Sequence, residues 1–395
     1  MAEPKVRFRR DDGSSYPAWR TIPMSEVFTE ISEKNHPELP VLSVQQGVGT
    51  VLRDSSDRNI LYDKSNLKNY KAMKKDDYII HLRSFEGGLE CSNYDGISSP
   101  AYRILRSQAI LPAAYRDYFR SYEFIHNKLA VSVVGIRDGK NIDMDTFWQI
   151  PMSIPCIEEQ QKIADFLSSV DAVITASEEE VANLETQKKA VMKKIFSQEV
   201  RFKRADGTDF PEWKEVSVKD IGTVVTGNTP PTKEEDNYGG DYLWVSPADI
   251  VANQYVYNTG KKLSDKGWAV ARHLPAGTIL VTCIASIGKN SILAVDGSCN
   301  QQINAIVPNG TMLAHFALEA INYKEHDLQL LGGNGGMKIV SKSLFEDFEL
   351  PCPSIEEQRL IADFLSDFDE AIVAAKKELE LWKELKTGLL QQMFA

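Results

Sequence analysis

Several polar loops of this chain contain side chains whose types could bind a nucleic acid. The stretch "CNQQIN" carries Asn300, Gln301 and Gln302, and the stretch "ASIGKNS" carries Lys289. Asparagine, glutamine, lysine and arginine are the side chains that hydrogen-bond to base edges in a major groove. Glycines in such loops let backbone amides approach phosphate groups. These loops could therefore bind the bases and phosphate groups of a nucleic acid.

We select the basic and hydrogen-bonding residues of these loops as candidate DNA contacts. Arg83 and Ser84 lie in "LRSFEGGLECSNYDG", Thr229 and Lys233 in "TGNTPPTKEEDNYGG", and Asn334 and Lys338 in "LGGNGGMK". The other candidates are Lys140, Lys289, Asn300, Gln301 and Gln302. The same residue types also occupy ordinary turns. The amides at 300–302 could instead satisfy buried backbone groups, and the basic side chains could simply be solvated.

No motif assembles a catalytic or metal site. The stretch "CIASIGKNS" fails as a P-loop because Cys283 occupies the first glycine position and Asn290 follows the lysine. The sequence contains no G-x-S-x-G, H-E-x-x-H or C-x-x-C, and its six histidines are scattered. The tripeptide at 384–386 mimics the end of a nuclease metal motif but lies within a heptad pattern. We therefore expect a chain with no catalytic residue and no metal.

Length and composition indicate a globular protein of two or three domains. The chain has 395 residues, of which 43% are apolar and 26% are charged. It has no apolar run long enough for a membrane span and no signal-peptide pattern, so we expect a cytoplasmic location and no membrane partner. The net charge of −11 argues against a nucleic-acid partner. Residues 155–198 and 353–395 carry much of the acidic surplus, which leaves room for basic surfaces elsewhere.

An eleven-residue stretch occurs twice, as "IEEQQKIADFL" at 157–167 and "IEEQRLIADFL" at 355–365. A period near 200 residues indicates duplication of a domain-sized unit. Each copy follows a proline and begins with glutamates, which favour the start of a helix. Ser354 and Glu357 have capping-box spacing, whereas Cys156 is a poorer cap in the first copy.

Apolar residues after each copy recur at steps of three and four, which is typical of a coiled-coil seam. In the first copy they are Ile163, Leu167, Val170, Ile174, Val181, Leu184 and Val191; in the second they are Ile361, Leu365, Phe368, Ile372, Leu379, Trp382 and Leu389. Two amphipathic helices packed on separate cores are the alternative. A helix of about 33 residues would span roughly 50 Å.

Two lysines that interrupt the seam favour antiparallel pairing. A parallel pair in register would place Lys188 against Lys386, which is a like-charge contact. An antiparallel pair places each lysine near the partner's Phe368 or Val170 layer instead. We therefore predict an antiparallel pair.

A second repeat predicts a circular layout. The stretch "VRFRRDDGSSYPAW" at 6–19 recurs as "VRFKRADGTDFPEW" at 200–213, directly after the first helix. The second helix is followed by no such stretch, so the N-terminal copy can supply it if the chain ends lie close together. The predicted parts are an N-terminal repeat segment at 1–19, a domain at 20–154, a helix at 155–198, a linker repeat at 199–213, a domain at 214–352 and a helix at 353–395.

The two domains share little sequence beyond faint landmarks. The β-like runs "DDYIIHL" at 76–82 and "AGTILVT" at 276–282 are each followed by an Asp-Gly turn, at Asp95 and Asp296. We predict an α+β protein: two mixed domains separated by two long antiparallel helices that form a coiled coil, with an internal pseudo-two-fold repeat.

This organisation resembles the specificity (S) subunit of type I restriction–modification systems. The repeated pattern P-x-x-EEQ-x-x-IADFL-x-x-x-D carries the resemblance, with Pro155 and Asp171 bounding one copy and Pro353 and Asp369 the other. The second domain is similar to target-recognition domains through "GNTPPT", "GGDYLWVSPADI" and "IGKNSILAVDGSCNQQINAI", and the first through "DGISSPAY". The resemblance covers essentially the whole chain.

The resemblance implies that each domain binds one half of a split, asymmetric sequence of double-stranded DNA, and that the helices set the spacing. It also implies docking of two methyltransferase (M) subunits and of restriction (R) subunits. Those partners would supply S-adenosylmethionine, ATP and magnesium chemistry, and this chain would bind no cofactor itself.

Three alternatives remain open from the sequence. An enzyme with duplicated catalytic domains requires a converging constellation in both domains, which the sequence does not contain. A coiled-coil interaction scaffold without a DNA role would lack salt-dependent DNA binding in the assembled complex. A specificity subunit of a methyltransferase-only system would carry the same sequence features as one that serves a restriction complex.

Overall fold

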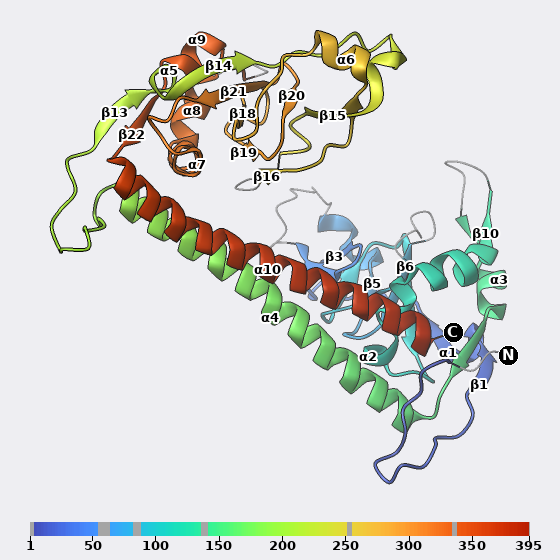
Figure 1. The fold of residues 1–395 in the computed structure, drawn as a ribbon. Coiled ribbons are helices and arrows are strands. Elements are labelled where there is room, and N and C mark those ends of the chain that lie inside the picture. Colours follow the sequence, from blue (N-terminus) through green and yellow to red (C-terminus); the bar gives the residue numbers. More distant parts are fainter. Residues whose placement is uncertain are drawn as a thin grey trace. The chain divides into compact units, whose positions relative to one another are not determined.

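The computed structural model describes residues 4–53, 64–81, 88–135, 141–250, 255–333 and 338–394. The chain divides into two compact units, one formed by residues 1–178 and 377–395 and the other by residues 179–376. Each unit contains one mixed domain and one portion of each of two long helices, α4 and α10 (Figure 1). No helix in the described ranges combines the length and apolarity needed to cross a membrane.

The first unit is built from short elements that precede the long helix α4. In order they are β1 (Arg20–Pro23), α1 (Met24–Val27), β2 (Phe28–Ile31), β3 (Leu42–Gln45), β4 (Gly49–Leu52), the 3₁₀ segment Lys64–Asn69, β5 (Lys71–Met73), β6 (Tyr78–His81), β7 (Glu90–Cys91), β8 (Gly96–Ser98), β9 (Tyr102–Ser107), α2 (Pro112–Tyr115), the helical turns Tyr118–Arg120, Phe124–Lys128 and Leu129–Ser132, β10 (Val133–Val134), β11 (Asn141–Ile142), α3 (Met144–Gln149) and β12 (Pro151–Ile154).

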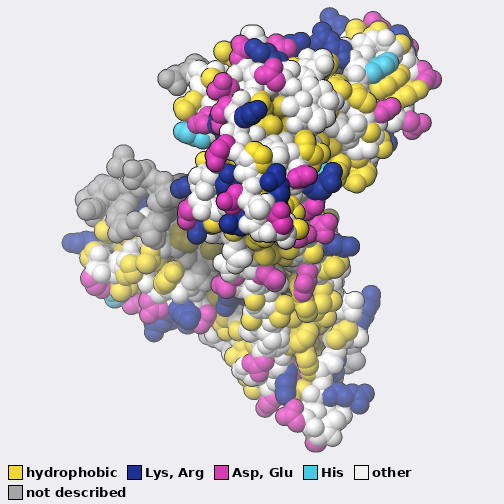
Figure 2. Space-filling model, turned by 60° about the vertical axis from the view of Figure 1, so that its left-hand side comes forward, with side chains coloured by type: hydrophobic (Ala, Val, Ile, Leu, Met, Phe, Trp, Pro, Cys, Tyr) yellow, Lys and Arg dark blue, Asp and Glu magenta, His cyan; other side chains and the backbone are white. Residues whose placement is uncertain are grey.

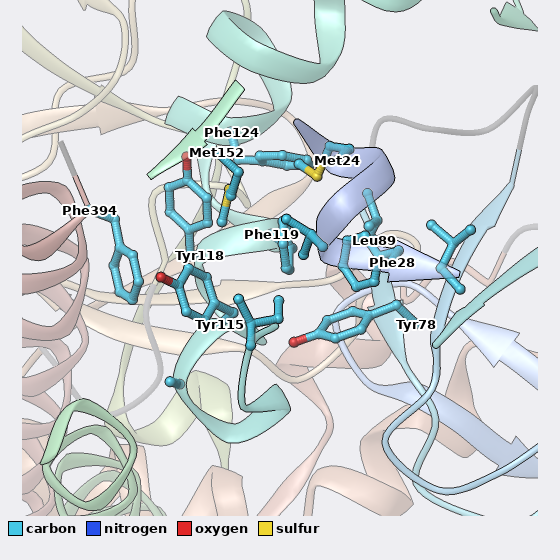
Figure 3. Packing of buried hydrophobic residues seen from close by; sticks show 14 of the residues in the cluster. Met24, Phe28, Tyr78, Leu89, Tyr115, Tyr118, Phe119, Phe124, Met152 and Phe394 are labelled. Atoms are coloured by element: carbon cyan, nitrogen blue, oxygen red, sulfur yellow. The ribbon is translucent and has the colours of Figure 1, made fainter. Parts of the chain in front are cut away.

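Strands β2, β9, β6 and β7 form the central antiparallel sheet of the first unit, in that order. Aromatic and aliphatic side chains fill one core beside it, among them Phe28, Tyr78 and Phe119 (Figure 3). Phe394, directly after α10, enters the same core and lies against Tyr115, with ring centroids 5.0 Å apart. The residues that close α10 and follow it are therefore part of the core of this unit.

The second unit repeats this plan with longer strands. Its elements are β13 (Lys214–Ser217), α5 (Val218–Ile221), β14 (Gly222–Thr226), the 3₁₀ turn Glu235–Asn237, β15 (Tyr238–Val245), β16 (Tyr255–Val256), β17 (Lys262–Leu263), α6 (Asp265–Val270), β18 (Ile279–Thr282), β19 (Asn290–Leu293), β20 (Gly297–Cys299), β21 (Ile303–Pro308), α7 (Ala314–Tyr323), α8 (Glu325–Leu331), α9 (Lys342–Glu346) and β22 (Glu349–Cys352). Strands β14, β21, β18, β19 and β16 form one sheet, and β17, β15 and β20 form another.

The two domains share a topology although their sequences differ. The first and last strands of each domain pair antiparallel, β1 with β12 and β13 with β22, so the chain enters and leaves each domain at one place. The predicted run at 76–82 contains β6 and the run at 276–282 contains β18, as expected. Asp95 accepts from the Lys75 amide and Asp296 from the Ala276 amide, at 2.7 and 2.9 Å. The two predicted Asp-Gly turns therefore make the same backbone contact in both domains.

Both repeated stretches begin long helices, α4 (Ile157–Phe196) and α10 (Ile355–Met393). At 40 and 39 residues they are longer than expected from the seam. In the first unit Lys383 pairs with Glu178 and Lys386 with Asp171; in the second, Lys376 pairs with Glu185. Along these pairs the residue number on α4 falls as the residue number on α10 rises. The helices α4 and α10 therefore run antiparallel within each unit, as predicted (Figure 1).

The helix start at Ser354 differs from the predicted capping box. The Ser354 hydroxyl accepts from the Glu357 amide at 3.4 Å, which is half of that motif. The Glu357 carboxylate binds Arg201 and Trp213 instead. The first turns of both helices have the same backbone hydrogen bond. The Gln160 backbone amide donates to the Cys156 carbonyl, and the Gln358 backbone amide donates to the Ser354 carbonyl. Cys156 therefore does not prevent α4 from beginning at Ile157.

Candidate nucleic-acid interface

In the second unit, a glycine lets two of the predicted loops pack together. A Cβ added to Gly227 would lie 2.2 Å from the Asn300 carbonyl oxygen, so a larger residue would displace one loop. The Asn228 amide donates to the Cys299 carbonyl at 2.9 Å. The Thr229 hydroxyl donates to the Gln301 side-chain oxygen. Thr229 and Gln301, 72 residues apart in sequence, therefore meet at one surface.

The neighbouring amides of "CNQQIN" bond within their own loop. Asn300 is only 7% exposed, and its side chain donates to the Gln302 side-chain oxygen at 3.0 Å. The Asn300 side-chain oxygen accepts from the Gln302 backbone amide, also at 3.0 Å. These two side chains shape the loop, whereas Gln301 is exposed and available to a ligand.

Sequence reasoning missed the residues that hold this surface from the other side. Asn228 donates through its side chain to the Val270 carbonyl and accepts from the Arg272 amide, at 2.9 and 2.8 Å. Trp244 donates from its indole nitrogen to the Asn228 carbonyl at 3.0 Å. The loop is consequently pinned to β15 and to the segment after α6. These contacts join residues 16 to 44 positions apart, which a local pattern does not reveal.

A second group of candidates surrounds a hollow of about 370 Å³ lined by the loop 285–289, α8 and the segment at 338. Lys289 and Lys338 both line it and are both exposed. Neither lysine forms an ion pair with a described residue. Glu325 lines the same hollow, and Gly288 has a positive φ of 98° where a Cβ would strike that glutamate. Among the described residues, the lining thus brings two exposed ammonium groups beside one carboxylate.

Backbone bonds connect the two groups of candidates. The Cys283 amide donates to the Gln302 carbonyl at 2.8 Å, and the Ala285 amide donates to the Lys338 carbonyl at 3.1 Å. The segment 283–285 therefore lies between the amide-rich loop and the lysine hollow. Both groups therefore belong to neighbouring segments of the second domain.

The remaining candidates are Lys233 and four residues outside the described ranges. Lys233 is exposed on the loop before the 3₁₀ turn Glu235–Asn237. Arg83, Ser84, Lys140 and Asn334 lie outside the described residues. On the face of the molecule seen in Figure 2, basic and acidic side chains are interspersed, so the net charge of −11 does not make that face uniformly acidic.

An equivalent buried glutamate in each long helix binds the linker segment that precedes a domain. Glu159 is fully buried and accepts from the Arg7 guanidinium at 3.1 and 2.8 Å and from the Trp19 indole at 3.1 Å. Glu357 accepts from Arg201 at 3.2 and 2.9 Å and from Trp213 at 3.0 Å. Both arginines also donate to linker carbonyls, at Pro17 and Pro211. The second glutamate of each repeat thus fastens a linker segment to a helix.

The glutamine that follows each glutamate fastens the domain itself. The Gln160 side-chain oxygen accepts from the Leu111 amide at 2.7 Å, and its nitrogen donates to the Ala109 and Pro155 carbonyls. Gln358 makes the same bonds with Leu313, Thr311 and Pro353. The repeated "EQ" dipeptide is therefore a clamp that carries two unlike domains in the same way.

The predicted seam is shared between helix pairing and domain attachment. Ile163, Leu167, Val170, Ile361, Leu365, Ile372 and Leu379 are buried, whereas Ile174, Val181, Leu184, Val191, Phe368, Trp382 and Leu389 are half-buried. Ile163 and Leu167 lie in one cluster with both domain residues and the α10 residue Met393. Near the start of each helix, the heptad positions therefore contact the domain core as well as the partner helix.

Three of the five cysteines are buried, and burial lowers their reactivity. Burial raises the pKa of Cys91 and of Cys283 to about 11 and that of Cys299 to about 12, so these thiols stay protonated near neutrality. Within the described ranges, no group of three or more His, Cys, Asp or Glu side chains could hold a metal ion.

Both halves of the chain match one protein family. The family is described as "Type I restriction modification DNA specificity domain", and it matches residues 29–186 and 211–381. The chain belongs to this family. The first match covers most of one mixed domain, the second covers all of the other, and each continues through most of the long helix that follows, so the specificity domain occurs twice here.

Relatives and solved structures agree with this family. The type I restriction enzyme MjaIX specificity subunit of Methanocaldococcus jannaschii is 32% identical over 206 residues, which are 50% of this chain and 48% of the relative. The chain spans about half the length of the curated relatives that it matches.

Two solved structures share the fold of this chain. One is the S subunit of a type I restriction–modification system from M. genitalium, with a TM-score of 0.57 at 14% identity, covering 100% of this chain and 99% of that one. The other comes from a study of complex assembly and conformational transition of the type I R-M system. It has a TM-score of 0.62 at 17% identity and covers 96% of this chain and 98% of that one.

Proposed function

We propose that this chain is the DNA specificity subunit of a type I restriction–modification complex and recognises a bipartite, asymmetric DNA site. The observation that supports this most directly is the pair of specificity-domain matches on two domains of unlike sequence. The clamps at Glu159 and Glu357 are equivalent, but the surfaces they carry differ. Two different surfaces held in equivalent ways suit two different half-sites.

Within the second domain, the geometry supports a division of labour. Lys289 and Lys338 are exposed and form no ion pair with a described residue, which suits contact with phosphate groups that position the duplex. Gln301 and Thr229 present hydrogen-bonding groups at one surface, which suits base edges that specify the sequence. Asn300 and Gln302 shape that loop from within.

The antiparallel helices would hold the half-sites at a fixed separation. The number of residues in a rigid helix fixes its length, at about 1.5 Å per residue. Proteins that bind two half-sites recognise their spacing because both contacts must form at once. The spacer between the half-sites would then be a property of the helix pair and of how each domain sits on it.

The catalytic work would belong to partner subunits. Two methyltransferase subunits would bring S-adenosylmethionine, and restriction subunits would bring ATP and magnesium chemistry. This chain would contribute binding energy and positioning. A methyltransferase-only assembly would use the same specificity chain without restriction subunits.

The decisive experiment expresses this chain with the methyltransferase encoded beside it in a host without DNA methylation and maps every modified base in the genome. One split motif, with two defined halves around an unspecified spacer, is the expected result. A soluble complex that copurifies but modifies no base would instead favour a scaffold without a DNA role.

A further inference from the structure

A buried lysine sits in the helix seam of the second unit. Lys188 of α4 is 7% exposed at its side chain and contacts the Asp369 carboxylate of α10 at 2.7 Å through both oxygens. It also contacts Glu319 of α7, a domain helix, at 2.6 Å. One ammonium group therefore joins both long helices to the recognition domain.

The contact continues from Glu319 into the domain. Burial raises the pKa of Glu319, although its contact with Lys188 opposes this shift. Its second oxygen accepts from the Asn322 side chain at 3.2 Å, and the Asn322 oxygen accepts from the Asn290 side chain at 2.7 Å. Asn290 is completely buried at the start of β19, directly after Lys289. A polar chain thus leads from the helix seam to the strand beside the lysine hollow.

Such a chain selects one arrangement among those that apolar packing would allow. Apolar heptads tolerate a slip of one heptad, because similar side chains then meet again. A slip here would separate Lys188 from Asp369 and leave a buried charge without its partner, which is costly. A rotation of the domain on the helices would break the contact with Glu319 in the same way. The chain therefore constrains both the register of the helices and the seating of the domain.

The first unit contains a shallower counterpart. Lys386 contacts Asp171 of α4 and Asp117 of the domain, both at 2.6 Å. Its side chain is 19% exposed, and those of Asp117 and Asp171 are 20% and 47% exposed. Water screens exposed pairs, so this group constrains its unit less than the buried one does. The second unit thus has the stronger constraint.

We propose that Lys188, Glu319, Asn322 and Asn290 are positioning residues that fix the loop 285–289 relative to the helix pair and so set the DNA spacer that the protein accepts. The DNA part of this inference rests on the proposed function. None of the four residues needs to touch DNA. They act by holding Lys289 and its loop in place.

Glu319→Gln is the sharpest test, because it preserves size and removes one acceptor. Glu319 accepts on both oxygens, from Lys188 and from Asn322. The two donors bind different oxygens and an amide nitrogen cannot accept, so the donor that faces the nitrogen loses its hydrogen bond to residue 319. The matched control is Lys376→Met, which removes an exposed pair with Glu185 on the same two helices, 2.7 Å apart.

Hydrogen exchange of the full chain tests the connection without any DNA. In Glu319→Gln we expect exchange at residues 282–293 to accelerate about tenfold relative to the rest of the unit, as for coupled sites. The control should exchange like the unaltered protein. Unchanged exchange at these residues would overturn the inference. An equal acceleration throughout the second unit would overturn it as well, since that result reports general destabilisation.

Base-modification mapping with the coexpressed methyltransferase tests the spacing. We expect the unaltered protein and Lys376→Met to modify one spacer length, and Glu319→Gln to modify sites one base pair shorter or longer as well. A single spacer in all three proteins would refute the role in spacing. If the unaltered protein modifies no split motif, the proposed function fails, and the exchange experiment still decides whether the chain positions the loop.

Discussion

The backbone amide of Val6 donates to the carbonyl of Gln392 across 3.2 Å, and Val200 makes the equivalent bond to Lys194 across 3.1 Å. In the second unit a covalent chain joins helix α4 directly to this linker segment. In the first unit the same contact joins segments near opposite ends of the chain. The linker of the first unit therefore docks without a covalent connection to its helix, as the predicted circular layout requires, with its opening between the two chain ends.

Moving that opening should leave a working protein. We expect a chain joined from Ala395 to Met1 by a short linker, and opened near residue 199, to fold and to modify the same DNA motif. The Val200 amide would then hold its linker on α4 without a covalent connection, as the Val6 amide now holds its linker on α10. Thermal unfolding and base-modification mapping check this. An equally joined chain opened inside β21 should misfold, because that strand lies within the sheet. Misfolding of both chains would contradict the circular arrangement.

Removing one clamp charge should destabilise the unit that contains it. Glu357→Gln loses a fully buried carboxylate. One of its oxygens accepts from both Arg201 and Trp213, and the other accepts from Arg201. Breaking a buried ion pair costs about 3 kcal/mol. Urea unfolding measures this loss. Glu356→Gln, on the exposed neighbour, should change stability by less than about 0.5 kcal/mol. Similar losses of unfolding free energy in the two variants would show that the buried contacts of Glu357 stabilise the unit no more than an exposed glutamate does.

The two lysines of the hollow should contribute to DNA affinity. We expect Lys289→Ala and Lys338→Ala each to weaken DNA binding by the assembled complex and to reduce the slope of log affinity against log salt by about 1. Assembly should be unaffected, because neither lysine forms an ion pair with a described residue. Titration at several salt concentrations measures both effects, with Lys376→Ala as the control. Unchanged affinity would remove these residues from the interface.

The buried thiols should be slow to react. A pKa of about 12 for Cys299, and of about 11 for Cys91 and Cys283, leaves on the order of 1 thiolate in 1000 or fewer at pH 8. We expect iodoacetamide to label Cys156, which is only half-buried, well before these three. Peptide mass spectrometry after timed labelling measures the order, and all five should label in urea. Rapid native labelling of Cys299 would mean that its strand opens readily.

The sequence by itself determined the repeating parts of this protein. The copies at 157–167 and 355–365 predicted two helices, because heptad spacing depends only on nearby residues. The interrupting lysines predicted the antiparallel direction, because like charges do not pair in a seam. Asp171 and Asp369, which pair with those lysines, close the repeated motif, so their partners could have been sought at the same positions.

Only the tertiary structure decided what the repeated residues contact. Glu159 meets Arg7 across 152 positions and Lys188 meets Glu319 across 131. The candidate loops at 229 and 301 also come together only when β14 and β21 pair. Glu357 has the spacing of a capping residue, yet its carboxylate binds a linker arginine instead. Local patterns report local geometry, whereas such partners depend on how distant strands and helices pack, and several sequences satisfy the same packing.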